Sequence, residues 1–521
     1  GKIKEITSVE QGKPILDGKL WKLITWLSTY YDTPIGLAAK AVLPSQLSTS
    51  YEPKNQNFAQ SLNSQNENNI KGSTQIKVFN YLKSQNSPVP FSALKIFTPN
   101  PSSVCNSLEK KGLIKIFQKP VIPNIYETSL ESEPKKIKLT NDQQNSISAI
   151  CTSLDQNIFD PYLLHGVTGS GKTEVFIEAS KHAIKQNKSV VVLLPEISTT
   201  PQIAGRFKSV FGDSVAVWHS KLSKPSRAWI WKKICNGDFK IIVGARSAIF
   251  TPLKNLGLII VDEEQEDAYK QTSPSPKYHA KEVSLMRGKI NKATVILSSA
   301  TPSLETYFNY KSNKFKYLEL PKRFGNAKLP YVHLVNMIDE NKTTENYDTI
   351  FSQLMLDKIN DRIKKNEQVI LLHNRRGFAP ILRCDDCGEI SKCPHCQLSL
   401  TFHKTDNVLK CHFCNFTKPP AGKCTKCSSF NGRLSGTGTQ KIEDELAKLF
   451  PDTVIDRLDL DATPTAQKIF HTLNKFSKNK IHILVGTQMI AKGLDFPNAT
   501  LVGIINADTG LFLPDFRSGE K

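Results

Sequence analysis

The chain has 521 residues, 39% hydrophobic and 22% charged, values that are ordinary for a globular protein and that predict roughly three to four domains. It contains no run of about 18 apolar residues, so no membrane-spanning helix and no membrane partner are expected. Lys and Arg number 69 against 48 acidic residues, a net charge of +21. That excess indicates either a polyanionic partner such as nucleic acid or a composition that simply favours Lys and Asn.

The first part of the chain predicts small helical units. Residues 1–44 carry apolar residues at helical spacing and lack both an initiator Met and a signal peptide, so we expect a domain remnant of a fragment or processed form. Residues 45–73 are rich in Ser, Asn and Gln and are expected to be a linker. Residues 74–130 predict three helices and a strand, which fits either a winged-helix-like domain or a generic helical insert.

From residue 139 the pattern changes to that of an α/β protein. Apolar strands alternate with helices, which indicates parallel sheets covered on both faces. The strands expected in residues 139–320 are SVVVLLP, KIIVGA, LGLIIVD and ATVILSSA. Those expected in a second lobe, residues 321–383 and 431–521, are QVILLHN, DTVIDRLD, IHILVGT and ATLVGIINA. The predicted fold class is therefore α/β, with two lobes in tandem.

A phosphate-binding loop is predicted by GVTGSGKT, which follows an apolar strand and opens a helix. Its residues are Gly166, Val167, Thr168, Gly169, Ser170, Gly171, Lys172 and Thr173. The glycines allow backbone N–H groups to face the phosphates of ATP, which Lys172 reaches directly, and Thr173 binds Mg²⁺. A chance glycine-rich turn is the alternative, and the complete motif in its required context argues against it.

Two acids complete the predicted catalytic set with Lys172. Asp262 and Glu263 follow the apolar run LGLIIV, about ninety residues after the phosphate-binding loop. Asp262 is expected to hold the Mg²⁺ shell and Glu263 to orient the attacking water. By themselves these acids would fit a solvated turn; with the loop they predict ATP hydrolysis.

Eight of the eleven cysteines form four CxxC pairs within residues 384–430. They are Cys384, Cys387, Cys393, Cys396, Cys411, Cys414, Cys424 and Cys427. Each pair offers two thiolates and tetrahedral Zn²⁺ takes four, so we expect a zinc-binding insertion with two ions per chain, in a reducing cytoplasm. Of three possible pairings, the spacing of the inner pairs favours a nested one. Redox thiols and an iron–sulfur cluster are the alternatives. His395, His403 and His412 could compete as ligands, but eight thiolates suffice, so we interpret these histidines as groups at the surface or around the metal ligands.

The motifs together resemble a known family. LTNDQQ, GVTGSGKTEVF, LLPEISTTPQ, VGARSAIFTPL, IIVDEEQEDAYKQ and SSATPSLE follow the motif order of superfamily 2 helicases. The match continues in LLHNRRGFAP, GTGTQKIEDEL and VGTQMIAKGLDFPNATLVGIINADTGLFLPDFR. With the cysteine cluster, residues 139–517 resemble the PriA family of replication restart helicases, and residues 16–44 resemble its N-terminal DNA-binding region more loosely. The resemblance implies two RecA-like lobes.

The resemblance also implies roles for single residues. Gln143 would read the adenine of ATP, and Gly493 and Asp495 would face the nucleotide from the second lobe. Arg246 and Ser247 would grip the DNA backbone. Ser299, Ala300 and Thr301 would couple hydrolysis to movement between the lobes.

YKQTSPSPKYHAK resembles the aromatic-rich loop of the family. Tyr269 and Tyr278 would stack on bases, and Lys270, Lys277 and Lys281 would neutralise phosphates. The alternative is an exposed basic loop without a partner.

The function implied by the resemblance is that of an ATP-dependent 3′→5′ DNA helicase. It would recognise stalled forks or D-loops, bind single-stranded DNA and single-stranded DNA-binding protein, and start primosome assembly with helicase-loading proteins. Two departures are noted: Gln265 stands where the family usually has His, and the chain ends before the arginine motif of the second lobe. They leave open a non-catalytic fork-binding scaffold, and an RNA remodeller is a further alternative.

Overall fold

The computed structural model describes residues 16–44, 55–62, 70, 72–85, 88–120, 138–195, 200–219, 222–326, 330–344, 349–373, 381–403, 406–420, 422–430, 432–435, 439–458, 466–487, 496–510 and 517. They belong to two compact units. The first draws on Gly1–Glu127, Leu222–Asp238 and Phe250–Pro252, and the second on Thr128–Lys221, Phe239–Ile249 and Leu253–Lys521. In this part of the chain, no helix has both the length and the apolar content needed to cross a bilayer.

Two helices form the N-terminal segment. Helix α1 (Gly18–Tyr30) begins where the Asp17 side chain accepts a hydrogen bond from the Leu20 amide at 2.7 Å. Its buried residues Leu20, Leu23, Ile24 and Leu27 recur at helical spacing and give it one apolar face. Helix α2 (Ile35–Val42) contacts α1. The helical spacing expected for residues 1–44 is therefore confirmed from Gly18 onward.

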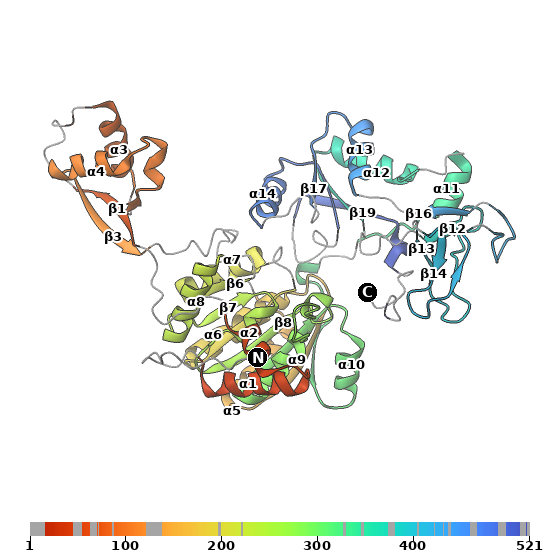
Figure 1. The fold of residues 1–521 in the computed structure, drawn as a ribbon, viewed down its shortest axis with the longest axis horizontal. Helices are drawn as coiled ribbons and strands as arrows, with labels where there is room; N and C mark the ends of the chain where they lie inside the picture. Colours follow the sequence, from red (N-terminus) through yellow and green to blue (C-terminus); the bar gives the residue numbers. More distant parts are fainter. Residues whose placement is uncertain are drawn as a thin grey trace, which may run out of the picture. The chain divides into compact units, whose positions relative to one another are not determined.

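The next segment is a small α/β unit with an antiparallel sheet of order β2-β1-β3, seen with α3 and α4 in Figure 1. Its elements are β1 (Asn55–Ser61), α3 (Ser73–Lys83), β2 (Val89–Pro90), η2 (Ala93–Ile96), α4 (Pro101–Lys110) and β3 (Ile114–Pro120). The linker expected at residues 45–73 is wrong, because β1 lies within it and is the central strand. NQNFAQS reads as polar, yet Ala59 is buried and Phe58 stacks on Phe117 with ring centres 6.4 Å apart.

The first α/β lobe holds a seven-stranded parallel sheet of order β10-β4-β9-β8-β5-β7-β6. Its strands are β4 (Pro161–Gly166), β5 (Ser189–Leu193), β6 (Val215–Trp218), β7 (Ile241–Gly244), β8 (Leu256–Asp262), β9 (Thr294–Ser299) and β10 (Lys316–Leu320). The helices between Asn141 and Lys311 are α5 (Asn141–Gln156), α6 (Lys172–Lys185), α7 (Thr200–Phe211), α8 (Lys224–Asn236), α9 (Ala280–Asn291) and α10 (Leu304–Lys311). Short 3₁₀ turns are η3 (Gly212–Ser214), η4 (Arg246–Phe250), η5 (Asp267–Tyr269) and η6 (Phe324–Asn326).

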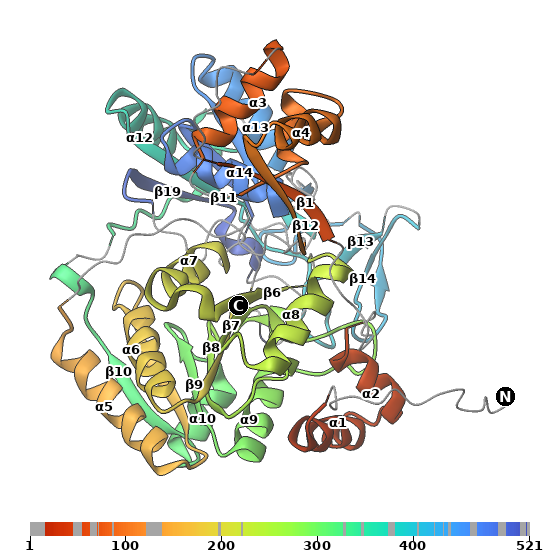
Figure 2. The ribbon, with the colours of Figure 1, turned by 90° about the vertical axis from the view of Figure 1, so that its left-hand side faces the viewer.

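Helices cover both faces of this sheet. Apolar side chains of α5, α6 and α7 pack with alternate strand residues, such as Val190 and Val192, in one buried core. Helix α9 contacts β8 and β9, on the other face from α5 and α6 (Figure 2). Burial on both faces explains why the strands read as continuous apolar runs. The strands run parallel, so the loops after β4, β8 and β9 leave the same edge of the sheet.

The second lobe has a four-stranded parallel sheet of order β17-β18-β11-β19. Its strands are β11 (Gln368–His373), β17 (Ile455–Leu458), β18 (Ile483–Gly486) and β19 (Ala499–Ile505). Its helices are α11 (Met337–Thr344), α12 (Gln353–Lys364), α13 (Thr439–Leu449), α14 (Ala466–Ser477) and η8 (Ala507–Gly510). The four strands are those predicted from sequence, and the predicted α/β class with tandem lobes is confirmed.

A five-stranded antiparallel sheet carries the cysteines. Its strands, in the order β15-β14-β13-β12-β16, are β12 (Ile381–Cys384), β13 (Thr401–His403), β14 (Val408–Lys410), β15 (Thr417–Lys418) and β16 (Gly432–Ser435). Strands β12 and β16 are the first and last of these strands along the chain, and they pair with each other. The chain therefore enters and leaves this sheet at neighbouring strands. Its core is small: the buried members are Leu400, Leu409, Cys393 and Cys411. So small a core needs another source of stability.

Candidate nucleotide site and zinc centres

The phosphate-binding loop joins β4 to α6 as predicted. Lys172 opens α6, and its Nζ donates to the Gly166 carbonyl at 2.9 Å, so the ammonium lies over the loop. A Cβ on Gly166 would lie 2.7 Å from Ser170 Oγ and 3.0 Å from Lys172 Cγ. Gly171 has φ +79°, a conformation that other residues rarely adopt. The loop is thus a tight cradle at a helix N-terminus, which fits a phosphate group.

Gln143 braces this loop. The amide Nε2 donates to the Ser170 carbonyl at 2.9 Å, and Oε1 accepts from the Thr140 amide at 2.8 Å. The Gln143 side chain is fully buried. In this structure the Gln143 amide is enclosed and supports the phosphate loop, and the expectation that Gln143 reads adenine stays a prediction.

The two predicted acids lie at the end of β8. Burial and the neighbouring Glu263 carboxylate raise the pKa of Asp262 to about 6, while the Lys172 ammonium and hydrogen bonds act in the opposite direction. Glu263 has φ +48°, and its amide donates to Asp262 Oδ1 at 3.1 Å. Two adjacent carboxylates beside a phosphate loop form an oxygen site that suits Mg²⁺. Lys172, Asp262 and Glu263 are brought together as predicted.

Gln265 connects the acids to the segment after β9. Its Nε2 donates to Glu263 Oε2 at 2.8 Å, and its Oε1 accepts from Ser299 Oγ at 2.7 Å. Ser299 Oγ in turn accepts from the Thr301 amide at 2.8 Å. This line of hydrogen bonds runs from Glu263, the predicted catalytic acid, to the segment expected to couple hydrolysis with movement. Gln265 therefore makes both contacts of a bridging group without carrying a charge.

Lys281 is part of a buried network. It is 7% exposed, and its Nζ bonds Glu264 Oε2 at 2.9 Å, Ser303 Oγ at 2.9 Å and Thr306 Oγ1 at 3.2 Å. Glu264 is 0% exposed and also accepts from the Ser303 amide at 2.7 Å. The expectation that Lys281 neutralises DNA phosphate is wrong in this structure, because the lysine balances a buried carboxylate.

The two tyrosines of the basic loop are also buried. Tyr269 is 0% exposed, and its hydroxyl donates to the Leu193 carbonyl at 3.0 Å and the Asp262 carbonyl at 2.5 Å. Tyr278 is 2% exposed, with the Arg246 guanidinium 5.8 Å from its ring centre. Base stacking needs an exposed ring face, so that expectation is corrected for both residues. The rings anchor the loop to the end of β8.

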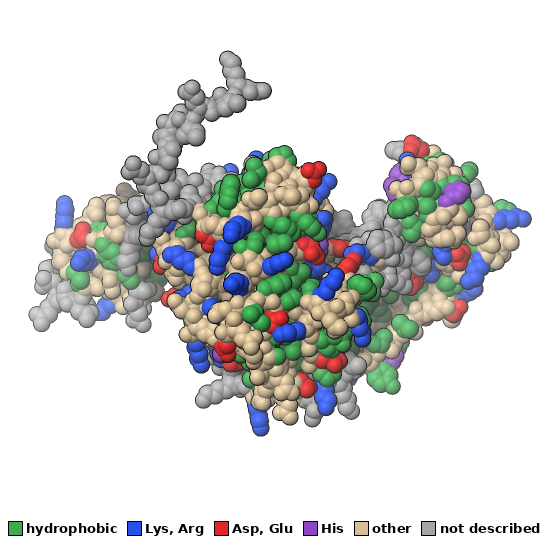
Figure 3. All heavy atoms as spheres, turned by 90° about the horizontal axis from the view of Figure 1, so that it is seen from below, with side chains coloured by type: hydrophobic (Ala, Val, Ile, Leu, Met, Phe, Trp, Pro, Cys, Tyr) green, Lys and Arg blue, Asp and Glu red, His purple; other side chains and the backbone are tan. Residues whose placement is uncertain are grey.

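Of the remaining predicted DNA-binding residues, Arg246 and Ser247 lie in η4 and Lys270 lies in the basic loop. Arg246 Nη1 donates to the Lys270 carbonyl at 2.7 Å, which ties η4 to the loop. Lys270 and Lys277 are exposed, and Ser247 is half-buried. Over the face drawn in Figure 3, Lys and Arg are scattered among apolar and acidic groups. The charges on this face therefore do not mark a DNA path.

Sequence reasoning missed several residues of the site. Glu264 and Ser303 belong to the buried network around Lys281. Their only signal in the sequence is that Glu264 is the third acid of the motif DEEQ. Arg323 lies beside the loop, with Cγ 3.8 Å from where a Cβ of Gly169 would be. No sequence pattern indicated Arg323. Gly493 and Asp495 lie outside the described residues.

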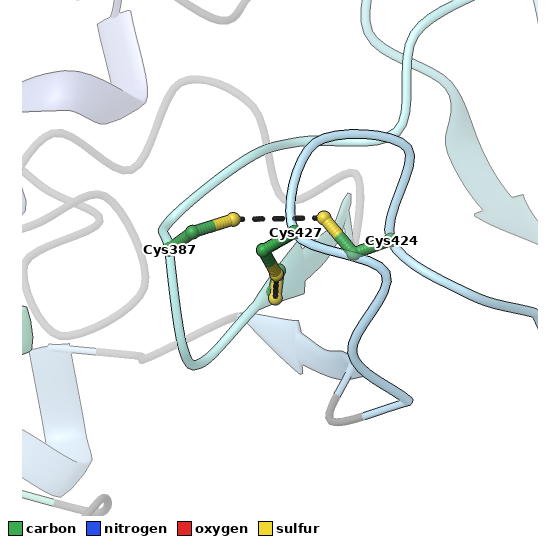
Figure 4. Close-up of side chains that lie close together, drawn as sticks. Cys387, Cys424 and Cys427 are labelled. Carbon is green, nitrogen blue, oxygen red and sulfur yellow. Dashed lines mark hydrogen bonds between the residues drawn. The ribbon is translucent and has the colours of Figure 1, made fainter.

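The eight cysteines form two groups of four. One joins Cys384, Cys387, Cys424 and Cys427, and the other joins Cys393, Cys396, Cys411 and Cys414. The nested pairing predicted from spacing is confirmed. In the outer group Cys387 Sγ lies 3.5 Å from Cys424 Sγ (Figure 4), and Cys384 Sγ lies 3.6 Å from Cys427 Sγ. Four sulfurs around Zn²⁺ at about 2.3 Å would be roughly 3.8 Å apart, so both groups fit zinc.

The thiols of these groups titrate unequally. Backbone N–H groups of Cys427 and Lys426 lower the pKa of Cys424 to about 7. In the other group, hydrogen bonding with Cys414 raises the pKa of Cys396 to about 12. Four thiolates this close repel one another, and a divalent cation removes that repulsion. The donor set is therefore suited to a metal ion.

Four family models match the chain. They are the 3′ DNA-binding domain over residues 1–44, the DEAD/DEAH box helicase over 140–309, the Cys-rich region of PriA DNA helicase over 393–419, and the helicase conserved C-terminal domain over 436–516. The fold and the site define an ATP-binding helicase with two α/β lobes.

Curated relatives narrow this class to one family. Replication restart protein PriA of Chlamydia pneumoniae is 39% identical over 530 residues, covering 100% of this chain and 70% of the relative. The same protein of Bacillus subtilis is 42% identical over 433 residues, covering 83% of this chain and 53% of the relative. Thus the chain spans about half the length of one relative and under three quarters of the other. The chain belongs to the PriA family of replication restart proteins.

Proposed function

We propose that this chain is the motor part of a 3′→5′ DNA helicase that restarts replication at stalled forks and D-loops. The observation that supports this most directly is the hydrogen-bonded line from Glu263 through Gln265 to Ser299 and Thr301. It links Glu263, the acid that would orient water, to the segment that follows β9. A helicase needs such a link to convert hydrolysis into movement, whereas a scaffold does not.

ATP and Mg²⁺ are the proposed nucleotide and ion, and Mg²⁺ supplies charge neutralisation on the phosphates when bound. Backbone N–H groups from Gly166 to Thr173 hold the phosphates, and Lys172 balances their charge. Thr173 and Asp262 hold the ion, and Glu263 orients water for attack. Gln265 keeps the Glu263 carboxylate in place through its 2.8 Å hydrogen bond.

Two zinc ions per chain are the proposed occupants of the cysteine groups. Each would contribute folding free energy on the order of 10–16 kcal/mol, enough to stabilise a sheet with so small a core. In this proposal the zinc-bearing sheet is a rigid part that acts as a wedge or docking platform.

The proposed partners are forked and single-stranded DNA, single-stranded DNA-binding protein, and the primosome and helicase-loading proteins, in the cytoplasm. Within the described residues we assign the DNA backbone contacts to Arg246, Ser247 and Lys270, with Gly493 and Asp495 kept as proposed nucleotide contacts. The match to the 3′ DNA-binding domain supports recognition of DNA ends at a fork.

The decisive experiment measures ATP hydrolysis with and without forked DNA, beside a Lys172→Ala control. We expect a DNA-stimulated rate that the variant loses. Unwinding of forks with only a 3′ or only a 5′ tail then tests direction. No stimulation above the Lys172→Ala background would support the fork-binding scaffold instead. Equal unwinding of a matched RNA duplex would support an RNA remodeller.

A further inference from the structure

Two histidines of the zinc-bearing sheet face each other. His403 ends β13, and His412 follows Cys411 after β14. Their Nε2 atoms are 3.2 Å apart, while their ring centres are 5.0 Å apart with an interplanar angle of 42°. Because the nitrogens are closer than the ring centres, both Nε2 atoms lie on the facing edges. The cysteine chemistry uses neither imidazole.

This geometry matches two ligands of one metal ion. At a metal–nitrogen distance of about 2.0–2.1 Å and a tetrahedral angle, two imidazole nitrogens would be roughly 3.3 Å apart. With the ion on both ring axes, the ring centres would be roughly 5 Å apart. The observed 3.2 Å and 5.0 Å agree with both values. A direct N–H···N hydrogen bond is the competing explanation for the short distance.

The pair is separate from the two cysteine groups. Each group already has four sulfurs, which is the full set for tetrahedral Zn²⁺. His412 is exposed and His403 is half-buried, so an ion can enter from solvent.

We propose that His403 and His412 form a third metal site, for one exchangeable divalent transition ion. Imidazole nitrogen suits Ni²⁺, Cu²⁺ and Zn²⁺, whereas Mg²⁺ and Ca²⁺ prefer oxygen. Two protein ligands leave further coordination positions open to water or to an anionic oxygen. The site therefore differs from the cysteine centres in being open and reversible.

The test is calorimetric titration of the zinc-loaded protein with Ni²⁺ at neutral pH. We expect one Ni²⁺ to bind per chain of the parent protein. His403→Ala and His412→Ala should each weaken the affinity for this Ni²⁺ at least tenfold. His395→Ala is the matched control, because His395 is also exposed and lies within a CxxC pair, and it should bind Ni²⁺ as the parent does. Zinc content of about two per chain in every variant shows that the cysteine centres are intact.

Three results would overturn the proposal. If the parent took up no additional Ni²⁺, the hydrogen bond would be the reason for the short distance between the Nε2 atoms. If both variants bound Ni²⁺ as the parent does, the ion would lie elsewhere. If nickel uptake were matched by zinc release, the nickel would be bound by the cysteines. His403→Ala is the cleaner variant, since His403 does not adjoin a cysteine.

Discussion

The buried ion pair of Glu264 and Lys281 allows the sharpest prediction about the first lobe. The carboxylate is 0% exposed and the lysine 7% exposed, so each charge depends on the other and on the hydroxyls of Ser303 and Thr306. Lys281→Met leaves the Glu264 carboxylate buried without a cation. Removing one partner of a buried pair costs about 3–5 kcal/mol of unfolding free energy. Because Lys281 joins α9 to the start of α10, we expect that loss in this lobe.

A double-mutant cycle separates the pair from its surroundings. Glu264→Gln combined with Lys281→Met removes both charges, and we expect it to be more stable than Lys281→Met alone, with a coupling of roughly 0.5–3 kcal/mol. Lys277→Met is the matched control, because Lys277 is an exposed lysine of the same loop. Its effect on stability should stay within about 0.5 kcal/mol.

Urea unfolding of the first lobe, followed by the fluorescence of buried tryptophans such as Trp218, measures these differences. DNA binding is measured in parallel at several salt concentrations. The reasoning is refuted if Lys281→Met keeps the unfolding midpoint of the parent but binds DNA more weakly with a smaller salt slope. That outcome would make Lys281 a phosphate ligand.

Four further predictions concern the catalytic loop and the cysteines. Burial raises the pKa of Asp262 to about 6 in the folded state. The free energy of unfolding should therefore fall as pH rises from about 4 to about 6, because the unfolded chain loses this proton more readily than the folded chain. Asp262→Asn should therefore stabilise the magnesium-free lobe by up to about 3 kcal/mol at neutral pH while abolishing ATP hydrolysis; an unchanged urea midpoint would contradict this. Gln265→Ala should reduce DNA-stimulated kcat by about 10–100-fold, since a hydrogen bond to a charged group is lost, and Gln265→His should recover most of it. Equal rates in all three proteins would argue against the bridge. Gly171→Ala should weaken ATP binding, because its Cβ would lie 2.3 Å from Gln143 Nε2 at φ +79°, and unchanged nucleotide affinity by fluorescence titration would count against the cradle. Cys411→Ser should lower the measured zinc content by one ion per chain and leave the urea transition of the first lobe in place; loss of both ions together would mean that the centres are not independent.

Local patterns in the sequence were enough to predict eight strands of the two α/β lobes, the phosphate loop and the metal ligands, but not β6, β10 or the strands of the zinc-bearing sheet. Each of these features depends on residues that are close together in the chain. An apolar run such as that of β8 is buried on both faces wherever it lies in a parallel sheet. A CxxC pair offers two thiolates to one ion regardless of its surroundings, and the spacing of the inner pairs favoured the nested arrangement that the structure has.

The polar strand β1 shows where such patterns fail. NQNFAQS has few apolar residues, and its strand conformation is stabilised by pairing on both sides, with β2 and with β3. The most distant pairing partners, Asn55 and Pro120, are separated by 65 positions along the chain, so no local window contains the signal.

What the sequence by itself determined is therefore the chemistry that is present: a phosphate cradle, two acids, and eight thiolates on tandem α/β lobes. Only the tertiary structure decided which side chains face solvent. The sequence pattern predicts Tyr269, Tyr278 and Lys281 as DNA ligands, yet all three side chains are buried. Tyr269 bonds the Leu193 and Asp262 carbonyls, and Lys281 bonds Glu264. The reason is physical: whether a cation balances a phosphate or a buried carboxylate depends on partners from distant strands, and the spacing of residues along the chain carries no record of them.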